Sequence, residues 1–291
     1  MNGLLIVNKP AGMTSHDVVA TVRRLTGESS IGHLGTLDPM ATGVLPLLLG
    51  RFTRLAQFFK QDSKCYSGTI RFGFATDTYD ADGVAVGERT DPELTLEMIR
   101  GIAASFRGEV AQMPPPFSAK KSQGVPAYKL ARQGKPANLR PVRINIRQFD
   151  ILGYDAPDAR FVVEVSSGSY IRSIAHDMGQ LAACGAHLRS LCRVRAGEFT
   201  LQQAATLDEI AAWQQEESLV ERLPHPRCVL PDMPSVTVDE NTATRLKNGM
   251  ACNLPEYSRA LYIKIFVSQR ELFAIGRRLA GTLIQPMAVL G

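Results

Sequence analysis

The chain has 291 residues, of which 45% are hydrophobic and 21% are charged. These values are ordinary for a globular protein and exclude wholesale disorder, and the length predicts one large domain with a smaller one. Lys and Arg number 33 against 28 Asp and Glu, which gives a formal net charge of +5. Such a modest basic excess fits an anionic partner without identifying it.

Several features of the sequence argue against membrane insertion, disulfides and metal binding. No apolar run approaches the ~20 residues that a membrane-spanning helix needs, and the N-terminal residues lack a signal-peptide pattern. The five cysteines include no C-x-x-C pair, and the C-x-x-H spacing of Cys184 and His187 has no second ligand pair. We therefore expect a cytoplasmic protein with no membrane partner and no bound metal.

Apolar periodicity predicts an alternation of strands and helices. Residues 4–7 form an apolar run that ends in turn-forming residues, which is typical of a buried strand. Residues 14–17 resemble a capping box, and apolar residues then recur at helical spacing until Gly27. Further elements are predicted as strands at 65–73, 161–165, 186–195 and 261–266 and as helices at 95–106, 171–181, 206–222 and 239–247.

Asp38 stands out in the glycine-rich loop of residues 32–43. It is the sole carboxylate between Glu28 and Asp62, and it precedes Pro39. An Asp before a proline is most often a turn or N-cap residue. A lone carboxylate in a stiff loop between apolar strands is also the arrangement expected of a nucleophile or a base. The residues alone leave both interpretations open.

The acidic segment Asp80-Ala81-Asp82-Gly83 resembles a calcium-binding loop. When Gly83 is aligned as the invariant glycine, however, Thr78 and Arg89 stand where carboxylates are needed. We therefore predict that this segment is a turn.

The predicted strand at 186–195 alternates between two faces. One face carries Leu191 together with four basic or potentially basic residues, namely His187, Arg189, Arg193 and Arg195. This composition suits a surface that faces an anionic ligand.

The segment between Glu109 and Asp150 contains no acidic residue. Its basic residues are Lys120, Lys121, Lys129, Arg132, Lys135, Arg140, Arg143 and Arg147. These eight exceed the net charge of the whole chain, so the basic character is local. A solvated loop with a chance bias is one interpretation. Contact with a polyanion explains the segment better, because phosphate neutralisation requires clustered Lys and Arg.

The loop around Asp38 belongs to a longer run of recognisable motifs. Residues 32–46 read G-H-L-G-T-L-D-P-M-A-T-G-V-L-P and closely resemble the signature of the TruB-type tRNA pseudouridine-55 synthases. Further matches follow in the same order, namely L-L-I-V-N-K-P-A-G-M-T-S-H-D-V-V, K-C-Y-S-G-T-I-R-F-G, T-D-T-Y-D-A-D-G, P-P-P-F-S-A-K-K and S-G-S-Y-I-R-S. The resemblance spans residues 3 to about 200.

The resemblance implies an α/β (α+β) pseudouridine synthase fold, with a large, mixed, mostly antiparallel sheet flanked by helices. The catalytic domain is expected at residues 1–228, with a basic insertion that clamps RNA at about 112–147. Prolines near residue 228 suggest a boundary, and residues 229–291 resemble the small RNA-binding PUA domain of the family.

The resemblance also implies roles for individual residues. Asp38 matches the catalytic aspartate, and Arg172 matches the basic residue that pairs with it. The walls of the uracil pocket match Tyr66, which stacks on the target base, together with Tyr170 and Leu191. His33 matches the histidine that helps to remodel the T loop. Four basic residues of the insertion are expected to contact RNA, namely Lys120, Lys121, Lys129 and Arg132.

Four of these residues also have a simpler interpretation. Tyr66 and Leu191 could be ordinary core residues, and Arg172 could be a surface contact to phosphate. His33 could be a loop histidine that is hydrogen-bonded to the backbone.

The implied reaction isomerises uridine 55 to pseudouridine in the T loop of tRNA, and it needs no cofactor, metal or external energy. We expect a monomer that binds the T arm. In the family the aspartate has been proposed to attack C1′ or C6, or to take a proton from C2′, and the sequence leaves these open. Two rival functions also remain, a non-catalytic tRNA-folding factor and an N-glycosidase with an aspartate nucleophile.

Overall fold

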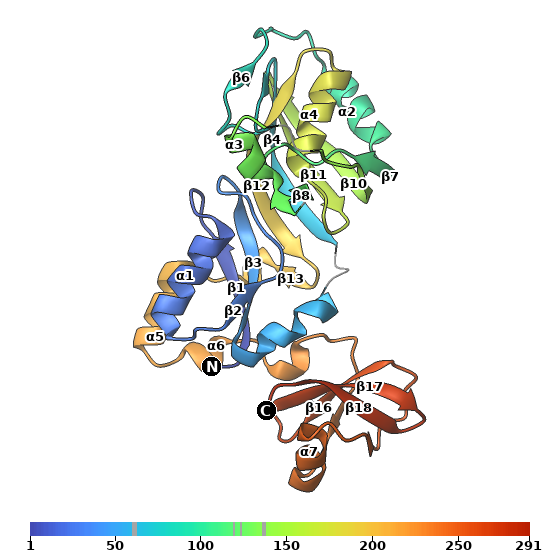
Figure 1. The fold of residues 1–291 in the computed structure, drawn as a ribbon. Coiled ribbons are helices and arrows are strands. Elements are labelled where there is room, and N and C mark those ends of the chain that lie inside the picture. The colour runs from blue at the N-terminus through green and yellow to red at the C-terminus, as the bar shows by residue number, and fades with distance from the viewer. Residues whose placement is uncertain (60–62, 119, 123, 136–137) are drawn as a thin grey trace.

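The computed structural model describes residues 1–59, 63–118, 120–122, 124–135 and 138–291. These residues form an elongated molecule whose large sheet runs through an upper and a lower part, with a smaller sheet at the C-terminal end (Figure 1). The large sheet contains β1 (Gly3–Lys9), β2 (Ile31–His33), β3 (Thr42–Leu49), β4 (Lys64–Phe72), β7 (Gly108–Gln112), β10 (Val142–Asp155), β11 (Asp158–Val165), β12 (Ala186–Ala196) and β13 (Phe199–Thr200).

The main path through this sheet is β1-β3-β12-β4-β11-β10-β7. Its strand pairs are antiparallel, except that β3 and β12 pair in parallel at Thr42 and Gly43. The sheet is therefore mixed and mostly antiparallel, which confirms the predicted fold class. The parallel contact joins the lower part to the upper part, directly after the loop that carries Asp38.

Two pairs of helices flank the sheet (Figure 1). The lower pair is α1 (Ser15–Thr26) and α5 (Leu207–Gln215), and the upper pair is α2 (Leu96–Ser105) and α4 (Ile171–Leu181). Buried side chains of both parts, including Val18, Leu47, Ile70 and Met178, belong to one hydrophobic cluster. The two parts therefore share a continuous core, which fixes the site between them.

Local sequence signals account for α1. The Thr14 side chain accepts a hydrogen bond from the Asp17 backbone, and the Asp17 carboxylate accepts one from the Thr14 backbone at 2.8 Å. Gly27 ends the helix in a left-handed conformation, with φ of +69°. The capping box and the glycine stop predicted from the sequence are thus confirmed.

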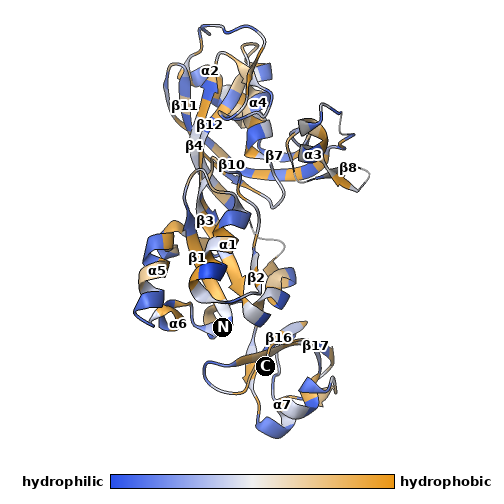
Figure 2. Cartoon of the chain, turned by 60° about the vertical axis from the view of Figure 1, so that its left-hand side comes forward, coloured by the Kyte–Doolittle hydropathy of each residue, from blue (hydrophilic) through white to orange (hydrophobic). Residues whose placement is uncertain are grey.

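The segment between β7 and β10 projects sideways from the upper part (Figure 2). It contains β8 (Lys121–Ser122), β9 (Val125–Pro126) and α3 (Ala127–Arg132). It returns to the sheet at Val142, so the last residues of the predicted insertion pair with β7. A separate hairpin, β5 (Ala75–Thr76) and β6 (Ala85–Val86), precedes α2.

A small sheet forms the C-terminal end in the order β14-β16-β17-β18-β15. Its strands are β14 (Ser235–Thr237), β15 (Cys252–Asn253), β16 (Tyr262–Phe266), β17 (Leu272–Ala280) and β18 (Leu283–Val289), and the helix α7 (Glu240–Lys247) lies between β14 and β15 in the chain. The remaining short and 3-10 helices of the described residues are η1 (Gly50–Phe59), η2 (Leu201–Gln203), α6 (Leu219–Arg222) and η3 (Pro226–Cys228). Among the helices of the described residues, none has both the length and the apolarity required to cross a bilayer.

The C-terminal sheet is docked on the lower part by buried contacts. Lys264 is 2% exposed, and its ammonium group donates to the carbonyl oxygens of Arg227 and Val229 at 2.8 and 3.0 Å. The rings of Phe58 and Tyr262 meet edge to face, with centroids 5.3 Å apart. The Lys264 contacts tie β16 to η3 and the residue after it, and the ring contact holds β16 against η1.

Candidate active site

The loop that carries Asp38 is tied to the start of α1. The Leu37 backbone N–H donates to the Ser15 hydroxyl at 2.8 Å, and that hydroxyl donates to the Leu37 carbonyl oxygen at 3.2 Å. Both residues are buried. The peptide unit just before Asp38 is therefore fixed to a helix rather than free in a loop.

A buried arginine of β12 holds the same loop from the other side. Arg193 is fully buried, and its guanidinium group donates to the carbonyl oxygens of Val44 at 2.7 Å and Gly35 at 3.1 Å. Gly43 packs so closely on the Arg193 backbone that a Cβ atom there would lie 2.3 Å from the Arg193 carbonyl oxygen. A larger residue at position 43 would therefore force the loop and β12 apart.

The burial of Arg193 corrects the prediction that one face of β12 presents basic residues to an anionic ligand. His187 is 4% exposed and Arg193 0% exposed, so neither lies on a surface. Register shifts between Leu188 and Ser190 and between Arg193 and Arg195 also break the strict alternation. Backbone carbonyl oxygens satisfy Arg193, and no sequence pattern marks such partners.

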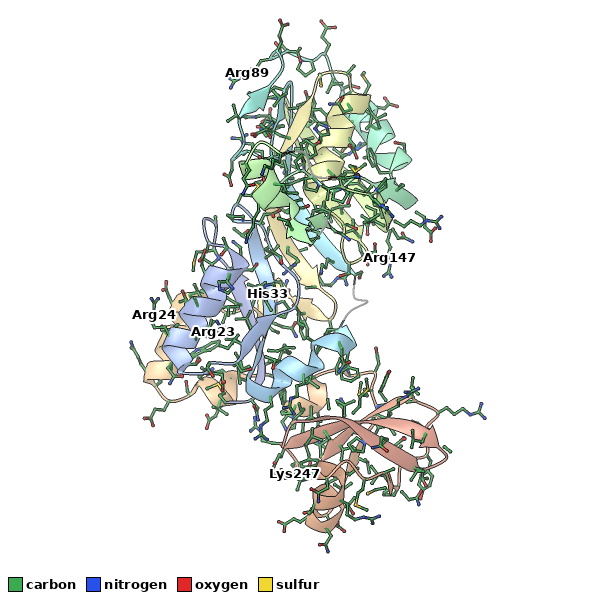
Figure 3. The ribbon with its side chains drawn as sticks, viewed as in Figure 1. Arg23, Arg24, His33, Arg89, Arg147 and Lys247 are labelled. Atoms are coloured by element: carbon green, nitrogen blue, oxygen red, sulfur yellow. The ribbon has the colours of Figure 1, made fainter. Side chains whose placement is uncertain are left out.

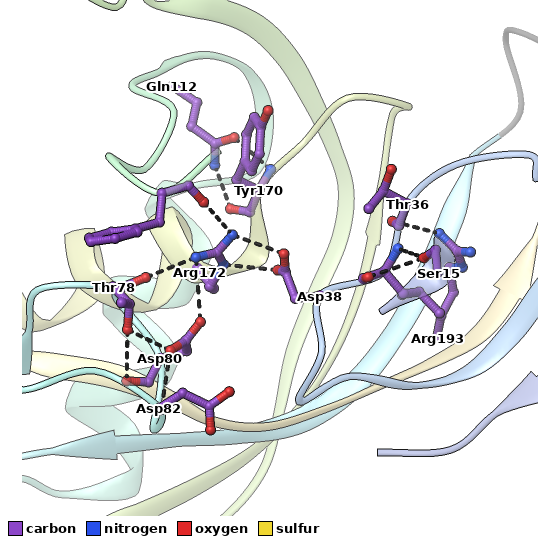
Figure 4. Close-up of polar contacts among 12 residues, drawn as sticks. Ser15, Thr36, Asp38, Thr78, Asp80, Asp82, Gln112, Tyr170, Arg172 and Arg193 are labelled. Atoms are coloured by element: carbon purple, nitrogen blue, oxygen red, sulfur yellow. Dashed lines mark hydrogen bonds and ion pairs between the residues drawn. The ribbon is translucent and has the colours of Figure 1, made fainter. Parts of the chain in front are cut away.

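Arg172 brings two carboxylates together (Figure 4). Its Nε and Nη2 atoms lie 2.9 Å from Oδ2 and Oδ1 of Asp38, and its Nη1 lies 3.4 Å from Oδ2 of Asp80. The same guanidinium group donates to the carbonyl oxygens of Thr78 at 3.1 Å and Phe117 at 3.0 Å. The Arg172 side chain is 7% exposed, so its guanidinium group is a buried centre of this network rather than a surface contact to phosphate.

The sequence predicts only a turn around Asp80, whereas the structure also places the Asp80 side chain in the site. The backbone does turn at this point, since the Gly83 N–H donates to the Asp80 carbonyl oxygen. The Asp80 side chain, however, is buried and faces Arg172 and the Thr78 hydroxyl. The one sequence signal for Asp80 is the T-D-T-Y-D-A-D-G motif, which matches the family although no role is assigned to its residues.

The charges around Asp38 act in opposite directions on its carboxyl group. Burial raises the pKa of Asp38 above its ordinary value, and the nearby Asp80 carboxylate adds to the rise. Arg172 and Lys9 lower the same pKa, because their positive charges favour the ionised form. The result is a carboxylate that is partly removed from water and oriented by a two-point guanidinium contact.

Lys9 is the second buried cation near Asp38. Its ammonium group donates to the carbonyl oxygens of Pro10 at 2.8 Å and Pro39 at 3.1 Å. Burial lowers the pKa of Lys9 to about 8, although the Asp38 charge opposes that shift. Lys9 thus joins the end of β1 to the residue that follows Asp38.

A cavity of about 350 Å³ opens over the Asp38–Arg172 pair. The predicted site residues that line it are Asp38, Tyr66, Lys120, Tyr170, Arg172 and Leu191. Tyr66 and Leu191 are 6% and 7% exposed, so they close the core and line the cavity at once. A carboxylate, a guanidinium group and flat or apolar walls therefore meet in a space large enough for a small ligand.

His33 lies at the end of β2 (Figure 3), outside this cavity. It lines an adjoining pocket of about 230 Å³, which shares Gly35, Lys64 and Ser167 with the first. Burial lowers the pKa of His33, and the Arg193 charge acts in the same direction. Among the described residues, no hydrogen-bond partner reaches its buried Nδ1, so the backbone does not satisfy that atom.

The basic residues predicted to contact RNA are only partly described. Lys120 and Lys129 are exposed, on the projecting segment between β7 and β10. Lys121 and Arg132 lie outside the residues whose side chains are described. In the described ranges, no group of three or more His, Cys, Asp or Glu side chains is arranged to hold a metal ion.

Two family models cover most of the chain. The model described as "TruB family pseudouridylate synthase (N terminal domain)" matches residues 23–171. The model described as "tRNA pseudouridylate synthase B C-terminal domain" matches residues 172–232. The junction between the two matches falls at the start of α4, next to Arg172.

Curated relatives and solved structures agree with these matches. The tRNA pseudouridine synthase B of Solibacter usitatus is 42% identical over 293 residues, which cover 100% of both chains. The protein of the same name from Syntrophotalea carbinolica is 44% identical over 217 residues, or 75% of this chain and 71% of that one. The structure titled "Structure of H/ACA RNP bound to a substrate RNA containing 2'-deoxyuridine" contains a chain with the same fold (TM-score 0.71, 23% identity), covering 99% of this chain and 85% of that one. The chain thus belongs to the TruB family of pseudouridylate synthases.

Proposed function

We propose that this chain isomerises uridine 55 to pseudouridine in the T loop of tRNA, with Asp38 as the catalytic residue. The family supports the reaction type, and the names of the curated relatives support tRNA as the substrate. The observation that carries the residue assignment is the contact of Arg172 with both Asp38 oxygens, beneath a cavity that Tyr66, Tyr170 and Leu191 line.

The isomerisation breaks the bond between N1 of uracil and C1′ of ribose and forms a bond between C5 and C1′. The C5 proton leaves and N1 gains a proton, so no oxidant or outside group is consumed. Asp38 serves each proposed route, attack at C1′ or C6 or removal of the C2′ proton, in its ionised form. Arg172 favours that form and keeps both carboxylate oxygens oriented.

The walls of the cavity retain the detached base while it turns. Tyr66 and Tyr170 offer ring faces, and Leu191 offers an apolar surface without a competing hydrogen-bond donor. These side chains favour a flat ring in several in-plane orientations, because stacking and apolar contact are insensitive to which edge of the base faces C1′. Uracil can then present C5 where N1 had been.

RNA binding offsets the cost of extracting the uridine, which is a few kcal/mol for a base in a folded loop. In this proposal His33 helps to open the T loop, and Lys120, Lys121, Lys129 and Arg132 clamp the T arm from the insertion at about 112–147. The catalytic domain comprises residues 1–228, and residues 229–291 form a PUA-like RNA-binding domain. The enzyme acts as a cytoplasmic monomer.

Asp38→Asn tests the catalytic assignment. Release of tritium from tRNA labelled at C5 of uridine, combined with nucleoside chromatography, is expected to show no turnover, whereas tRNA affinity stays close to that of the wild type. Asp208→Asn, an exposed Asp on α5, is the matched control and should retain full activity. Retained turnover in Asp38→Asn would refute the assignment.

The same assay separates the two rival functions. A tRNA-folding factor would release no tritium even as the wild-type protein. An N-glycosidase would release free uracil and leave an abasic site, whereas the proposed reaction retains the base as pseudouridine.

A further inference from the structure

A buried glutamine of β7 contacts the wall of the active-site cavity from behind. Gln112 is 3% exposed and ends the strand from which the basic segment departs. Its amide nitrogen donates to the Tyr170 carbonyl oxygen at 2.9 Å, and its amide oxygen accepts from the Tyr170 N–H at 2.8 Å (Figure 4). One side-chain amide therefore satisfies both polar backbone groups of a single residue, as a paired strand would.

Tyr170 is a position where such support is needed. It is the N-cap of α4, and its own side chain makes no capping hydrogen bond. In a capping box the third residue of the helix bonds back to the N-cap N–H. The third residue of α4, Ser173, instead donates its hydroxyl to the Met113 carbonyl oxygen at 2.8 Å. Gln112, which lies 58 residues before Tyr170 in the chain, accepts the hydrogen bond from the N-cap N–H instead.

The start of α4 and the entry to the basic segment are consequently joined at three points. Gln112 pairs with Tyr170, and Ser173 contacts Met113. The third contact is that of Arg172 with the Phe117 carbonyl oxygen. Because Arg172 lies in the first turn of α4, any shift of that turn moves its guanidinium group relative to Asp38.

We propose that Gln112 is a positioning residue for the isomerisation. It holds Tyr170 and the first turn of α4 so that Arg172 meets both oxygens of Asp38. Gln112 is not among the residues that line the cavity, so it acts through Tyr170 and Arg172 rather than on the substrate. The inference rests on the proposed function, because it assigns Gln112 to the same reaction.

Gln112→Ala removes both hydrogen bonds. Under single-turnover conditions the rate of pseudouridine formation should fall about 10- to 100-fold, because small displacements of a catalytic group have effects of that order. The Kd for tRNA should change less than about twofold, since no RNA contact is removed. Gln180→Ala is the matched control, because Gln180 is exposed on the same helix. Its rate and its melting temperature should equal those of the wild type.

Gln112→Glu separates positioning from a general loss of structure. The ionised carboxylate accepts from the Tyr170 N–H but repels the Tyr170 carbonyl oxygen. The protonated carboxyl group both accepts and donates, as the amide does. Burial raises the pKa of the introduced carboxyl group, so it gains its proton within the assay range. The rate of this variant relative to wild type should therefore rise as the pH falls from about 8 to about 5.5.

The outcomes are distinct. A Gln112→Ala variant within about twofold of the wild-type rate would overturn the inference, as would a Gln112→Glu ratio that stays flat or falls as the pH is lowered. The second measurement decides the matter if Gln112→Ala does not fold. If the wild type itself forms no pseudouridine, the proposed function fails, whereas normal wild-type turnover with these results refutes only the role of Gln112.

Discussion

The loop that carries Asp38 and the segment between β7 and β10 are held in opposite ways. The loop is fixed by buried polar side chains, with Ser15 on one side and Arg193 on the other. The projecting segment presents exposed charges such as Lys120 and Lys129. Catalytic groups must be positioned to within a fraction of an ångström. Exposed cations bind a polyanion by long-range attraction, which does not depend on such exact positions. Changes in the first region should therefore affect rate or stability, and changes in the second should affect affinity.

Among the variants that retain Asp38, Arg172→Lys is expected to have the largest effect on rate. A lysine carries one point charge and cannot hold both Asp38 oxygens together with the Thr78 and Phe117 carbonyl oxygens. We expect kcat to fall by about 10²- to 10³-fold with little change in tRNA affinity. Arg89→Lys, an exposed arginine, serves as the control for the chemistry of the substitution. A kcat within a factor of ten of the wild-type value would mean that the two-point contact is dispensable.

Arg193→Met probes the other buried guanidinium group through stability. It removes the donors to the Val44 and Gly35 carbonyl oxygens, and urea unfolding should show a loss of about 3 kcal/mol in the free energy of unfolding. Arg195→Met, two residues along the same strand and paired with Glu164 near the surface, should lose only about 1 kcal/mol. Equal losses for the two variants would contradict the role of Arg193 in holding the loop that carries Asp38.

Asp80→Asn tests the electrostatics of the site through the pH dependence of kcat. In the proposed mechanism Asp38 acts in its ionised form, and its pKa is raised, so activity should fall as the pH is lowered through that pKa. Removing the Asp80 charge lowers the pKa of Asp38 and should move this acidic limb to lower pH, while the weaker hold on Arg172 lowers the maximum about tenfold. A limb that moves to higher pH would contradict the assigned network.

Charge reversal of Lys120 and Lys121 probes the second region. tRNA binding should weaken, and the slope of log K against log salt should decrease by about one for each lost phosphate contact. The rate at saturating tRNA should change little, because lost phosphate contacts weaken binding rather than the chemical step. Arg24→Glu, on the exposed face of α1, is the control. Unchanged affinity and unchanged slope would remove the clamp assignment.

The large features of the fold could be predicted from local patterns. The capping box of α1, its glycine stop and the alternation in β4 depend on neighbouring residues, and the structure confirms these elements. The family motifs single out Asp38, Tyr66, Tyr170, Arg172 and Leu191, and the structure places all five around one cavity. Short-range physics and a long ordered motif were sufficient for this much.

The features that the sequence does not predict share one property: the interacting residues lie far apart in the chain. Arg193 and Gln112 bind backbone groups, and a backbone group has no side chain by which a pattern could identify it. The sequence around Asp80 is typical of a turn, and the backbone does turn there. Only the fold brings the Asp80 side chain to Arg172. A register shift in β12 between Leu188 and Ser190 also places Arg193 on the buried face, which a strict two-residue period could not anticipate.

The most direct measurement is the single-turnover formation of pseudouridine with tRNA already bound to saturating Asp38→Asn enzyme. Binding is then complete, so the assay reports the chemical step alone. The account predicts that tRNA binds with nearly wild-type affinity and that its uridine persists unchanged. Conversion at a rate near that of the wild type, with the carboxylate replaced by an amide, would contradict it.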